Sequence, residues 1–260
     1  MTAMKKSSAG GARGADGSAP RFFVPESFAA QGTVTVGEDA ARHMRVLRLG
    51  PGSVVTLLDG QGGRASGTVR AVGKRSATIT IERTEAVPAP LAMHALVPIA
   101  DRERMLWLAE KASELALTSW RPVLWKRSRS VSPRGEGGGF QGKVRARMAA
   151  ALEQSGNAWL PVIYPDATLD RALAALPDGT RLVLDPDGSP LALIDRRELA
   201  EPVVVAVGHE GGFEPPELES LTAAGFRRVS LGSTTLRFET AGVVALAEVR
   251  ARLGLVGETE

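Results

Sequence analysis

The chain contains no cysteine among its 260 residues. A disulfide framework, a thiolate nucleophile and a cysteine-bound metal are therefore excluded. Histidine is scarce too, since only His43, His94 and His209 are present. A metal centre built from several histidines is not expected, and we predict no metal partner.

The chain also lacks any apolar run long enough to cross a bilayer, although 43% of its residues are hydrophobic. A chain of this length has room for two domains and a sizeable core. We therefore expect a soluble, cytoplasmic, globular protein with no membrane partner.

Residues 1–20 are rich in glycine, serine and alanine and show no periodic apolar pattern, which predicts a disordered tail. The apolar core of a secretory signal is missing. Lys5, Lys6 and Arg13 against Asp16 place +2 of the formal net charge of +3 in this tail. The net charge therefore says little about the folded part.

Local charge is more informative, because two blocks of the chain are strongly basic. The span 42–83 has eight basic residues against two acidic ones, and the span 121–150 has eight against one. Such an uneven distribution is typical of a phosphate-binding face. Ordinary solvated surface charge explains either block equally simply, so both interpretations stay open.

Residues 21–84 read as short strands that alternate between apolar and polar residues and are separated by turn signals. A short helix is predicted over Glu38–Arg48, where Gly50-Pro51-Gly52 ends it. This pattern predicts a small β-barrel. The proline-rich segment Thr84–Pro90 then marks a domain boundary.

Strands and amphipathic helices alternate over residues 91–256, which is the signature of an α/β domain with a mainly parallel sheet. Asp101 is predicted to cap a helix that continues to Leu115, and a helix is predicted from Lys143 to Gln154. We further predict a helix over Asp166–Leu176 and a strand over Arg181–Asp185.

The last quarter of the chain holds two strand exits of similar form. An apolar run, Val203–Val207, ends in Gly208-His209-Glu210-Gly211-Gly212, and a second exit spans Leu231–Ala241. Ligands of parallel sheets bind at the carboxyl ends of the strands, where glycines allow close backbone approach. The two exits therefore predict one binding site made by two loops, although glycine content alone also fits ordinary turns.

The order of residues across both exits resembles the RsmE family of 16S ribosomal RNA uridine N3-methyltransferases, which are SPOUT enzymes. The family pattern I-G-P-E-G-G-(F/L) corresponds to VGHEGGF at Val207–Phe213, and L-G-x-x-(I/V)-L-R-x-E-T-A corresponds to LGSTTLRFETA at Leu231–Ala241. His209 stands where the family usually has proline, Thr235 where it usually has an aliphatic residue, and Phe238 where it usually has threonine.

The resemblance implies an α/β SPOUT domain with a carboxy-terminal trefoil knot at 91–256 and a PUA-like RNA-binding barrel at 21–84. It implies S-adenosylmethionine as cofactor, 16S rRNA of the small ribosomal subunit as partner, and a homodimer. Two alternatives stay open: a SPOUT enzyme acting on another RNA position, such as a ribose 2′-hydroxyl, and a non-catalytic RNA-binding or ribosome-assembly protein. The missing cysteine also fits methylation at a ring nitrogen, which needs no covalent thiolate adduct.

The same resemblance, together with the chemistry of the cofactor, nominates site residues. Arg237 is the predicted partner of charge on the uracil carbonyl oxygens or a phosphate anchor, while Glu239 or Glu210 assists removal of the N3 proton. Cofactor contacts are predicted for Leu184, Val207, Gly208, Glu210, Gly211, Gly212, Leu231, Gly232, Ser233 and Leu236. RNA contacts are predicted for Arg21, His43, Arg45, Arg48, Lys126, Arg127 and Arg129, with a structural role for His43 weighed equally.

Overall fold

The computed structural model describes residues 19–25, 28, 32–130 and 134–254, which form two compact units. The first unit is built from the chain up to Pro88 together with Leu152–Ala158. The second comprises Ala89–Ala151 and the chain from Trp159 onward. Apart from Ala19 and Pro20, the tail predicted at 1–20 lies outside the described residues.

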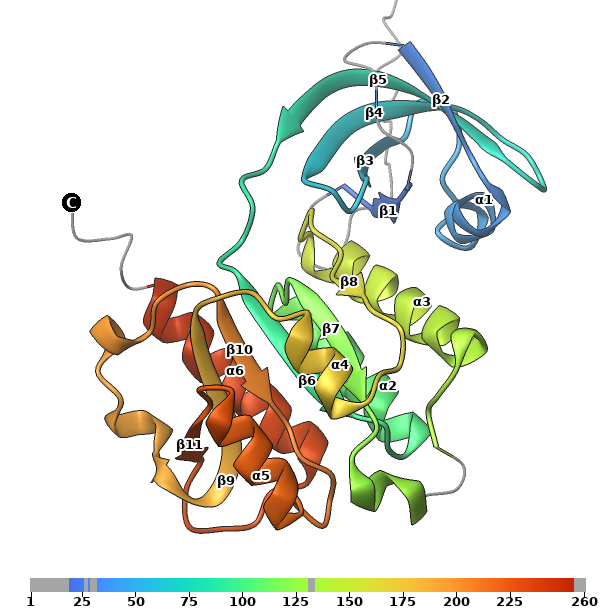
Figure 1. Ribbon diagram of the computed structural model, residues 1–260. Helices are drawn as coiled ribbons and strands as arrows, with labels where there is room; N and C mark the ends of the chain where they lie inside the picture. Colours follow the sequence, from blue (N-terminus) through green and yellow to red (C-terminus); the bar gives the residue numbers. More distant parts are fainter. Residues whose placement is uncertain (1–18, 26–27, 29–31, 131–133, 255–260) are drawn as a thin grey trace, which may run out of the picture. The chain divides into compact units, whose positions relative to one another are not determined.

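The first unit contains a five-stranded sheet with the order β1-β3-β4-β5-β2 (Figure 1). The elements are β1 (Arg21–Phe23), β2 (Gly32–Val36), α1 (Glu38–Val46), β3 (Val54–Leu58), β4 (Gly63–Val72) and β5 (Ala77–Ala86). β1 pairs with β3 in parallel, and the other neighbours are antiparallel. Within the described residues β1 and β2 do not pair with each other, so hydrogen bonds do not close the sheet into the predicted barrel.

Alternation along the strands explains the core of the first unit. Ala77, Ile79 and Ile81 of β5 are buried, while the residues between them are only partly so. Ala41 and Met44 lie on one face of α1 and pack into the same core. A strand that is apolar on one face buries that face alone, as the sequence pattern predicts.

The second unit is a six-stranded, all-parallel sheet with the order β11-β9-β10-β6-β7-β8. Its strands are β6 (Met93–Pro98), β7 (Ser119–Val123), β8 (Val162–Ile163), β9 (Thr180–Pro190), β10 (Val203–Ala206) and β11 (Arg227–Ser230). Its helices are α2 (Arg102–Glu114), α3 (Gly138–Ser155), α4 (Leu169–Ala174), α5 (Pro215–Ala223) and α6 (Phe238–Gly254). The predicted α/β architecture with a parallel sheet is confirmed.

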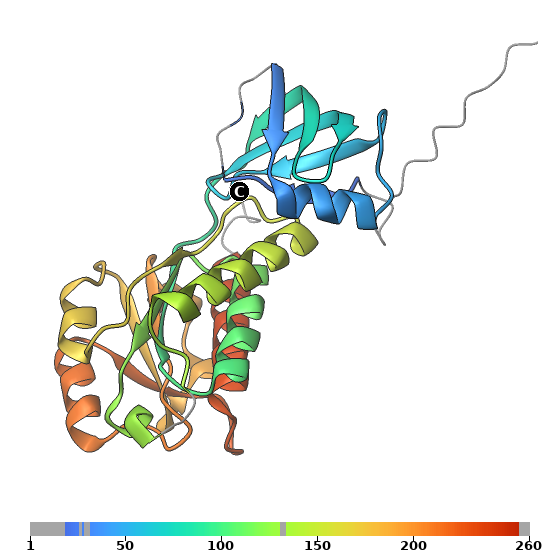
Figure 2. The same ribbon diagram turned by 90° about the vertical axis from the view of Figure 1, so that its right-hand side faces the viewer.

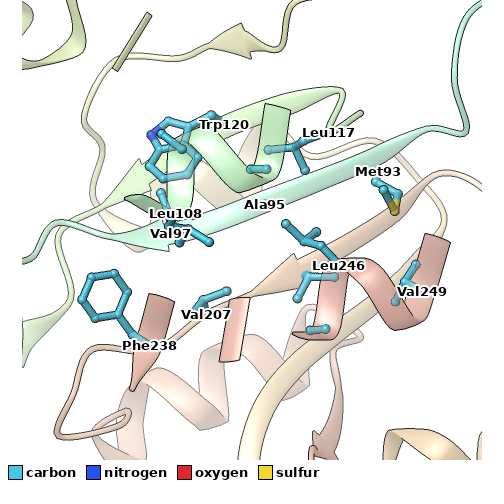
Figure 3. Packing of buried hydrophobic residues seen from close by; sticks show 14 of the residues in the cluster. Met93, Ala95, Val97, Leu108, Leu117, Trp120, Val207, Phe238, Leu246 and Val249 are labelled. Carbon is cyan, nitrogen blue, oxygen red and sulfur yellow. The ribbon is translucent and has the colours of Figure 1, made fainter. Parts of the chain in front are cut away.

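Helices cover both faces of this sheet (Figures 1 and 2). Val203 and Val205 of β10 point into the core shared with α2, α3 and α6, while Val204 and Ala206 point into the core beneath α4 and α5. Figure 3 shows the first of these cores, where Leu246 of α6 packs beside strand residues. Burial on both faces is why the Val203–Val207 run does not alternate.

Element bounds differ from the prediction in places. The predicted helix over 166–176 forms only as α4, Leu169–Ala174, and the strand predicted to end at Asp185 continues to Pro190. A register shift between Arg228 and Val229 accommodates the longer β9 against β11. The two-residue strand β8 was not predicted, because two residues carry no periodicity. No helix in the described part of the chain is long and apolar enough to cross a membrane.

We expect the same substitution at two glycines to change stability in opposite directions. A Cβ at Gly188 would lie 2.5 Å from the backbone nitrogen of Val229, so Gly188→Ala should lower the free energy of unfolding by about 1–3 kcal/mol. Gly142, inside α3, has open space around it, so Gly142→Ala should raise that free energy by about 0.5–1 kcal/mol. Urea denaturation of both variants measures these changes, and equal shifts in one direction would contradict the packing described for β9 and β11.

Candidate functional site

The two predicted strand exits meet at one edge of the sheet of the second unit. β9 pairs in parallel with β10 on one side and with β11 on the other. The carboxyl ends of the three strands therefore lie at the same edge, and the loops that follow them face one another. The loops after β10 and β11, which are separate in the sequence, therefore lie at one edge of the sheet, as predicted.

A pocket of about 230 Å³ lies between these loops. β9 contributes Leu184, Asp185 and Pro186, and the start of α6 contributes Phe238 and Ala241. Of the ten residues predicted to contact a cofactor, nine line this pocket: Leu184, Val207, Gly208, Glu210, Gly212, Leu231, Gly232, Ser233 and Leu236. Gly211 is in the same loop but does not line the pocket, and a Cβ at this position would lie 3.0 Å from Cδ of Arg127.

The base of the loop after β10 is held by aromatic side chains. The indole Nε1 of Trp125 donates a hydrogen bond of 3.1 Å to the carbonyl oxygen of Val207. The rings of Trp125 and Phe213 pack edge to face, with centroids 4.9 Å apart. A Cβ at Gly208 would lie 2.9 Å from the Phe213 ring, so glycine is required for this packing.

His209 begins a tight turn in this loop, with Glu210 and Gly211 at its centre. Its carbonyl oxygen accepts a hydrogen bond of 2.7 Å from the Gly212 amide, and its Nδ1 accepts one of 3.3 Å from the Gly211 amide. Gly212 has a φ of +72°, which favours glycine. The backbone turn therefore forms with histidine where relatives of the resembled family usually have proline.

Two carboxylates of the site share one cation that sequence reasoning missed. Arg104, in the first turn of α2, forms an ion pair with Glu210, and its Nε lies 3.9 Å from Oε1 of Glu239. Glu239 is only 8% exposed, and its Oε2 has no hydrogen-bond partner among the described residues. The sequence carried no signal for Arg104, because the contact joins segments more than a hundred positions apart.

Arg237 lies between the pocket residues Leu236 and Phe238 and is exposed. Its side chain does not line the pocket, and among the described residues it has no ion-pair partner. Its carbonyl oxygen accepts a hydrogen bond of 2.8 Å from the Ala241 amide, which starts the backbone ladder of α6. The guanidinium group is therefore available beside the pocket.

Asp185 is a charged residue of the pocket that was not predicted. It lines the pocket, is 7% exposed, and accepts a hydrogen bond of 2.7 Å from Nε of Arg228. Asp185 is the last residue of the strand that the sequence predicts over Arg181–Asp185. That position was a usable signal, because strand ends at this edge supply ligand contacts.

The residues predicted to contact RNA divide between the two units. In the first unit Arg21 donates a hydrogen bond of 2.9 Å to the Gln154 carbonyl oxygen, and the His43 ring packs edge to face on Phe22. His43 Nδ1 also lies 3.9 Å from Oε2 of Glu153, which favours the structural alternative for this histidine. Arg45 donates to backbone carbonyls at Gly73 and Lys74, and Arg48 is exposed.

In the second unit the remaining predicted RNA residues belong to a short 3-10 helix, η1 (Lys126–Ser130). Nε of Arg127 donates a hydrogen bond of 2.6 Å to Glu214, and this bond lowers the pKa of the Glu214 carboxyl. Lys126 is exposed, and the side chain of Arg129 lies outside the described residues. Within the described part of the chain no three potential metal ligands gather.

Comparisons with known proteins match both units. The RNA methyltransferase domain family matches residues 87–250, and the RNA methyltransferase PUA domain family matches residues 36–82. Ribosomal RNA small subunit methyltransferase E of Synechocystis is 29% identical over 241 residues, which cover 90% of this chain and 78% of the relative. The protein of the same name from Mycobacterium bovis is 27% identical and covers 88% of this chain and 90% of the relative.

Solved structures agree with these relatives. Ribosomal RNA small subunit methyltransferase E from Neisseria gonorrhoeae, bound to S-adenosyl methionine, has a TM-score of 0.80 at 29% identity. The match covers 90% of this chain and 97% of that one. A probable rRNA-methyltransferase from Porphyromonas gingivalis has a TM-score of 0.75 at 27% identity and covers 91% of this chain and 99% of that one.

We expect His209 to titrate below pH 6.5. Burial, aided by the positive charge of Arg127, lowers the pKa of its imidazole from 6.5. Well above pH 6.5 the histidine is neutral in both the folded and the unfolded chain. As the pH falls further the unfolded chain binds the proton first, so the free energy of unfolding decreases until the pH reaches the folded pKa.

Nuclear magnetic resonance of the three histidine rings measures this pKa, and His209→Asn assigns the signal while keeping an acceptor near Nδ1. The loss of stability between pH 6.5 and the folded pKa should be smaller in the variant. A His209 resonance that titrates at or above 6.5 would contradict the burial described here.

Proposed function

Because the chain belongs to the RNA methyltransferase family, we propose that it transfers the methyl group of S-adenosylmethionine to N3 of a uridine in 16S ribosomal RNA of the small ribosomal subunit. The pocket between the loops after β10 and β11 carries this proposal. Its lining follows the order of the family motif, and a relative 29% identical to this chain binds S-adenosyl methionine.

The residues of the pocket fit the cofactor chemically. S-adenosylmethionine combines an adenine with a positively charged sulfonium and an ammonium group, so it needs apolar walls, backbone polar groups and negative charge. Leu184, Leu231 and Leu236 supply apolar surface, while the glycine loops leave backbone exposed. Asp185 and Glu210 bring carboxylates to the same lining. When bound, the cofactor supplies the methyl group.

The side chains around the pocket suit transfer to a ring nitrogen. The N3 proton of uracil has to leave, and negative charge develops on the flanking carbonyl oxygens. In this proposal Glu239 or Glu210 assists proton removal, and Arg237 meets the developing charge or anchors a phosphate. The absence of cysteine in the whole chain fits a reaction that forms no covalent thiolate adduct.

RNA binding is proposed for both units. The first unit, spanning the predicted domain 21–84, matches a PUA domain model and carries one basic block. The second unit, which holds most of the predicted domain 91–256, carries the other basic block, part of it in η1. Neutralisation of RNA phosphates by lysine and arginine supplies sequence-independent affinity. Arg45, Arg48 and Lys126 are exposed enough to do this.

We also propose a homodimer and a trefoil knot, both of which the resemblance implies. An apolar groove of about 460 Å³ lies beside the carboxy-terminal half of α6 and the residues that follow α2, lined by Leu91, Leu115 and Ala247 among others, and offers a surface for a second copy. The chain after the edge strand β11 returns to pack α6 on the central strands β10 and β6. A crystal structure of the protein would test both features together.

The alternatives predict different products. A SPOUT enzyme acting on a ribose would leave a 2′-O-methylated nucleoside, and a non-catalytic RNA-binding protein would bind no S-adenosylmethionine. Incubation with purified small subunits and S-adenosylmethionine, followed by nucleoside mass spectrometry, separates these outcomes. The proposed function requires 3-methyluridine. Calorimetry with S-adenosylmethionine alone tests the pocket without RNA.

We expect Gly232→Ala to weaken S-adenosylmethionine binding by at least about tenfold. Gly232 lines the pocket with a φ of +127°, so a side chain there both strains the backbone and enters the lining. Gly225→Ala is the matched control, because Gly225 has a φ of +83° and open surroundings but lies outside the pocket. Isothermal titration calorimetry of both variants measures the difference. Equal S-adenosylmethionine affinities in the two variants would show that Gly232 does not contact the cofactor.

We expect Arg237→Ala to abolish methyl transfer while S-adenosylmethionine binding stays within about threefold of the unmodified chain. Loss of a single electrostatic partner of developing charge typically lowers turnover by about 10²–10³-fold. Arg171→Ala, on the exposed face of α4, removes an equal charge away from the pocket and should leave turnover unchanged. Full activity in Arg237→Ala would refute the role given to Arg237.

A further inference from the structure

Arg104 connects α2 to two elements that line the pocket between the loops after β10 and β11. It lies in the first turn of α2, and α2 and α6 lie side by side on one face of the sheet (Figures 1 and 2). Its guanidinium group forms an ion pair with Glu210, in the loop after β10. Its Nε lies 3.9 Å from Oε1 of Glu239, in the first turn of α6. Arg104 itself does not line the pocket.

The position of this arginine in its helix is unfavourable by itself. The first turn of a helix carries partial positive charge, which disfavours a cation. The backbone of Arg104 is nevertheless fixed there, because its amide donates a hydrogen bond of 3.1 Å to Oδ1 of the cap residue Asp101. The carboxylates of Glu210 and Glu239 offset the unfavourable charge. The arginine therefore has a fixed backbone and two anionic partners outside its own helix.

The ion pair holds a part of the loop after β10 that the aromatic contacts do not reach. At the base of the loop, Trp125 contacts both the carbonyl oxygen of Val207 and the ring of Phe213. At its centre Glu210 is exposed, and among the described residues Arg104 is its one ion-pair partner. The ion pair therefore ties the centre of the loop to α2.

Glu239 attracts the same arginine from the start of α6. The residue is 8% exposed, and a carboxylate in the first turn of a helix is stabilised by the partial charge there. The distance of 3.9 Å is too long for a hydrogen bond, but the attraction is strong because Glu239 is largely removed from water. Phe238 and Ala241 of the same helical turn line the pocket. Arg104 thus contacts both sides of the pocket from outside it.

We infer that Arg104 is a positioning residue of this pocket, which holds the loop after β10 through Glu210 and aligns it with the first turn of α6. The inference rests on the proposed function, because it requires that the pocket binds S-adenosylmethionine. A loop that is ordered before binding lowers the conformational cost of binding. Without the ion pair, the affinity for the cofactor falls in proportion to the fraction of chains in which the loop is correctly placed.

Two ligands separate this role from a simple effect of charge. S-adenosylmethionine carries a positive sulfonium, whereas its demethylated product, S-adenosylhomocysteine, has a neutral sulfur. Removal of a nearby positive charge would by itself strengthen binding of the sulfonium relative to the neutral thioether. Loss of loop positioning would instead weaken both ligands by the same factor.

The experiment uses substitutions that remove or keep the guanidinium charge. Arg104→Met keeps an unbranched side chain and removes the charge, and Arg104→Lys keeps the charge. Glu210→Ala removes the partner, and a double variant combines Arg104→Met with Glu210→Ala. Arg227→Ala is the matched control, because it breaks an ion pair of 2.6 Å between Arg227 and Glu198, both exposed and outside the pocket.

Isothermal titration calorimetry of each variant measures the affinities for S-adenosylmethionine and S-adenosylhomocysteine, and thermal unfolding measures stability. We expect Arg104→Met to weaken both ligands by about five- to tenfold, slightly less than the usual effect of losing a hydrogen bond to a charged group, because the pair is partly exposed. The ratio of the two affinities should stay within about twofold of that of the unmodified chain. Arg104→Lys should stay within about threefold and Arg227→Ala within about twofold.

The double variant tests whether Arg104 acts through Glu210. It should bind both ligands as weakly as Glu210→Ala alone, because removal of Glu210 already breaks the contact. The unfolding temperature of Arg104→Met should stay within about 4 °C of that of the unmodified chain, since an exposed ion pair contributes little to global stability.

Unchanged affinities in Arg104→Met, or stronger binding of S-adenosylmethionine relative to S-adenosylhomocysteine, would overturn the positioning role and leave the proposed function intact. Additive losses in the double variant, or a larger fall in unfolding temperature, would also overturn it, because Arg104 would then act independently of Glu210 or through global stability. If the unmodified chain bound no S-adenosylmethionine, the proposed function would be wrong, and the positioning role with it.

Discussion

The parallel pairing of β9 with β10 and β11 is the constraint on which the site depends. Because β9 lies between the other two strands, the loops that leave β10 and β11 reach the same edge of the sheet. The pocket is the space between those loops. Burial of β10 on both faces fixes the position of its end, since Val203 and Val205 pack toward α6 while Val204 and Ala206 pack toward α5.

Around the pocket, carboxylates lie in the lining and arginines lie outside it. Carboxylates of Asp185 and Glu210 lie in the lining, where a cationic cofactor would bind, and each is paired with an arginine outside it. The arginines Arg228 and Arg104 contact these carboxylates and do not themselves line the pocket. A site that holds a sulfonium cofactor beside RNA needs its arginines outside the lining, because arginines in the lining would repel the sulfonium.

Much of this was predictable from the sequence because it depends on periodicity and chain order. The apolar run before Gly208 predicted the sheet type and the first loop, and the resemblance carried by the motif from Leu231 to Ala241 nominated ten cofactor residues, nine of which line the pocket. Helix starts were predictable where a cap was present, as at Asp101, whose side chain accepts a hydrogen bond from the Arg104 amide.

The parts that could not be predicted depend on contacts between distant segments. Arg104 reads as an ordinary first-turn arginine until the fold places it against Glu210 and Glu239. The segment Leu152–Ala158 continues a helix of the second unit, yet it belongs to the first, where Arg21 and Arg64 donate hydrogen bonds to the carbonyl oxygens of Gln154 and Gly156. Arginines near a helix end stabilise its unpaired carbonyls. Basic residues that resembled RNA contacts in the sequence are therefore partly engaged within the fold, and the surface left for phosphate is smaller than their number suggests.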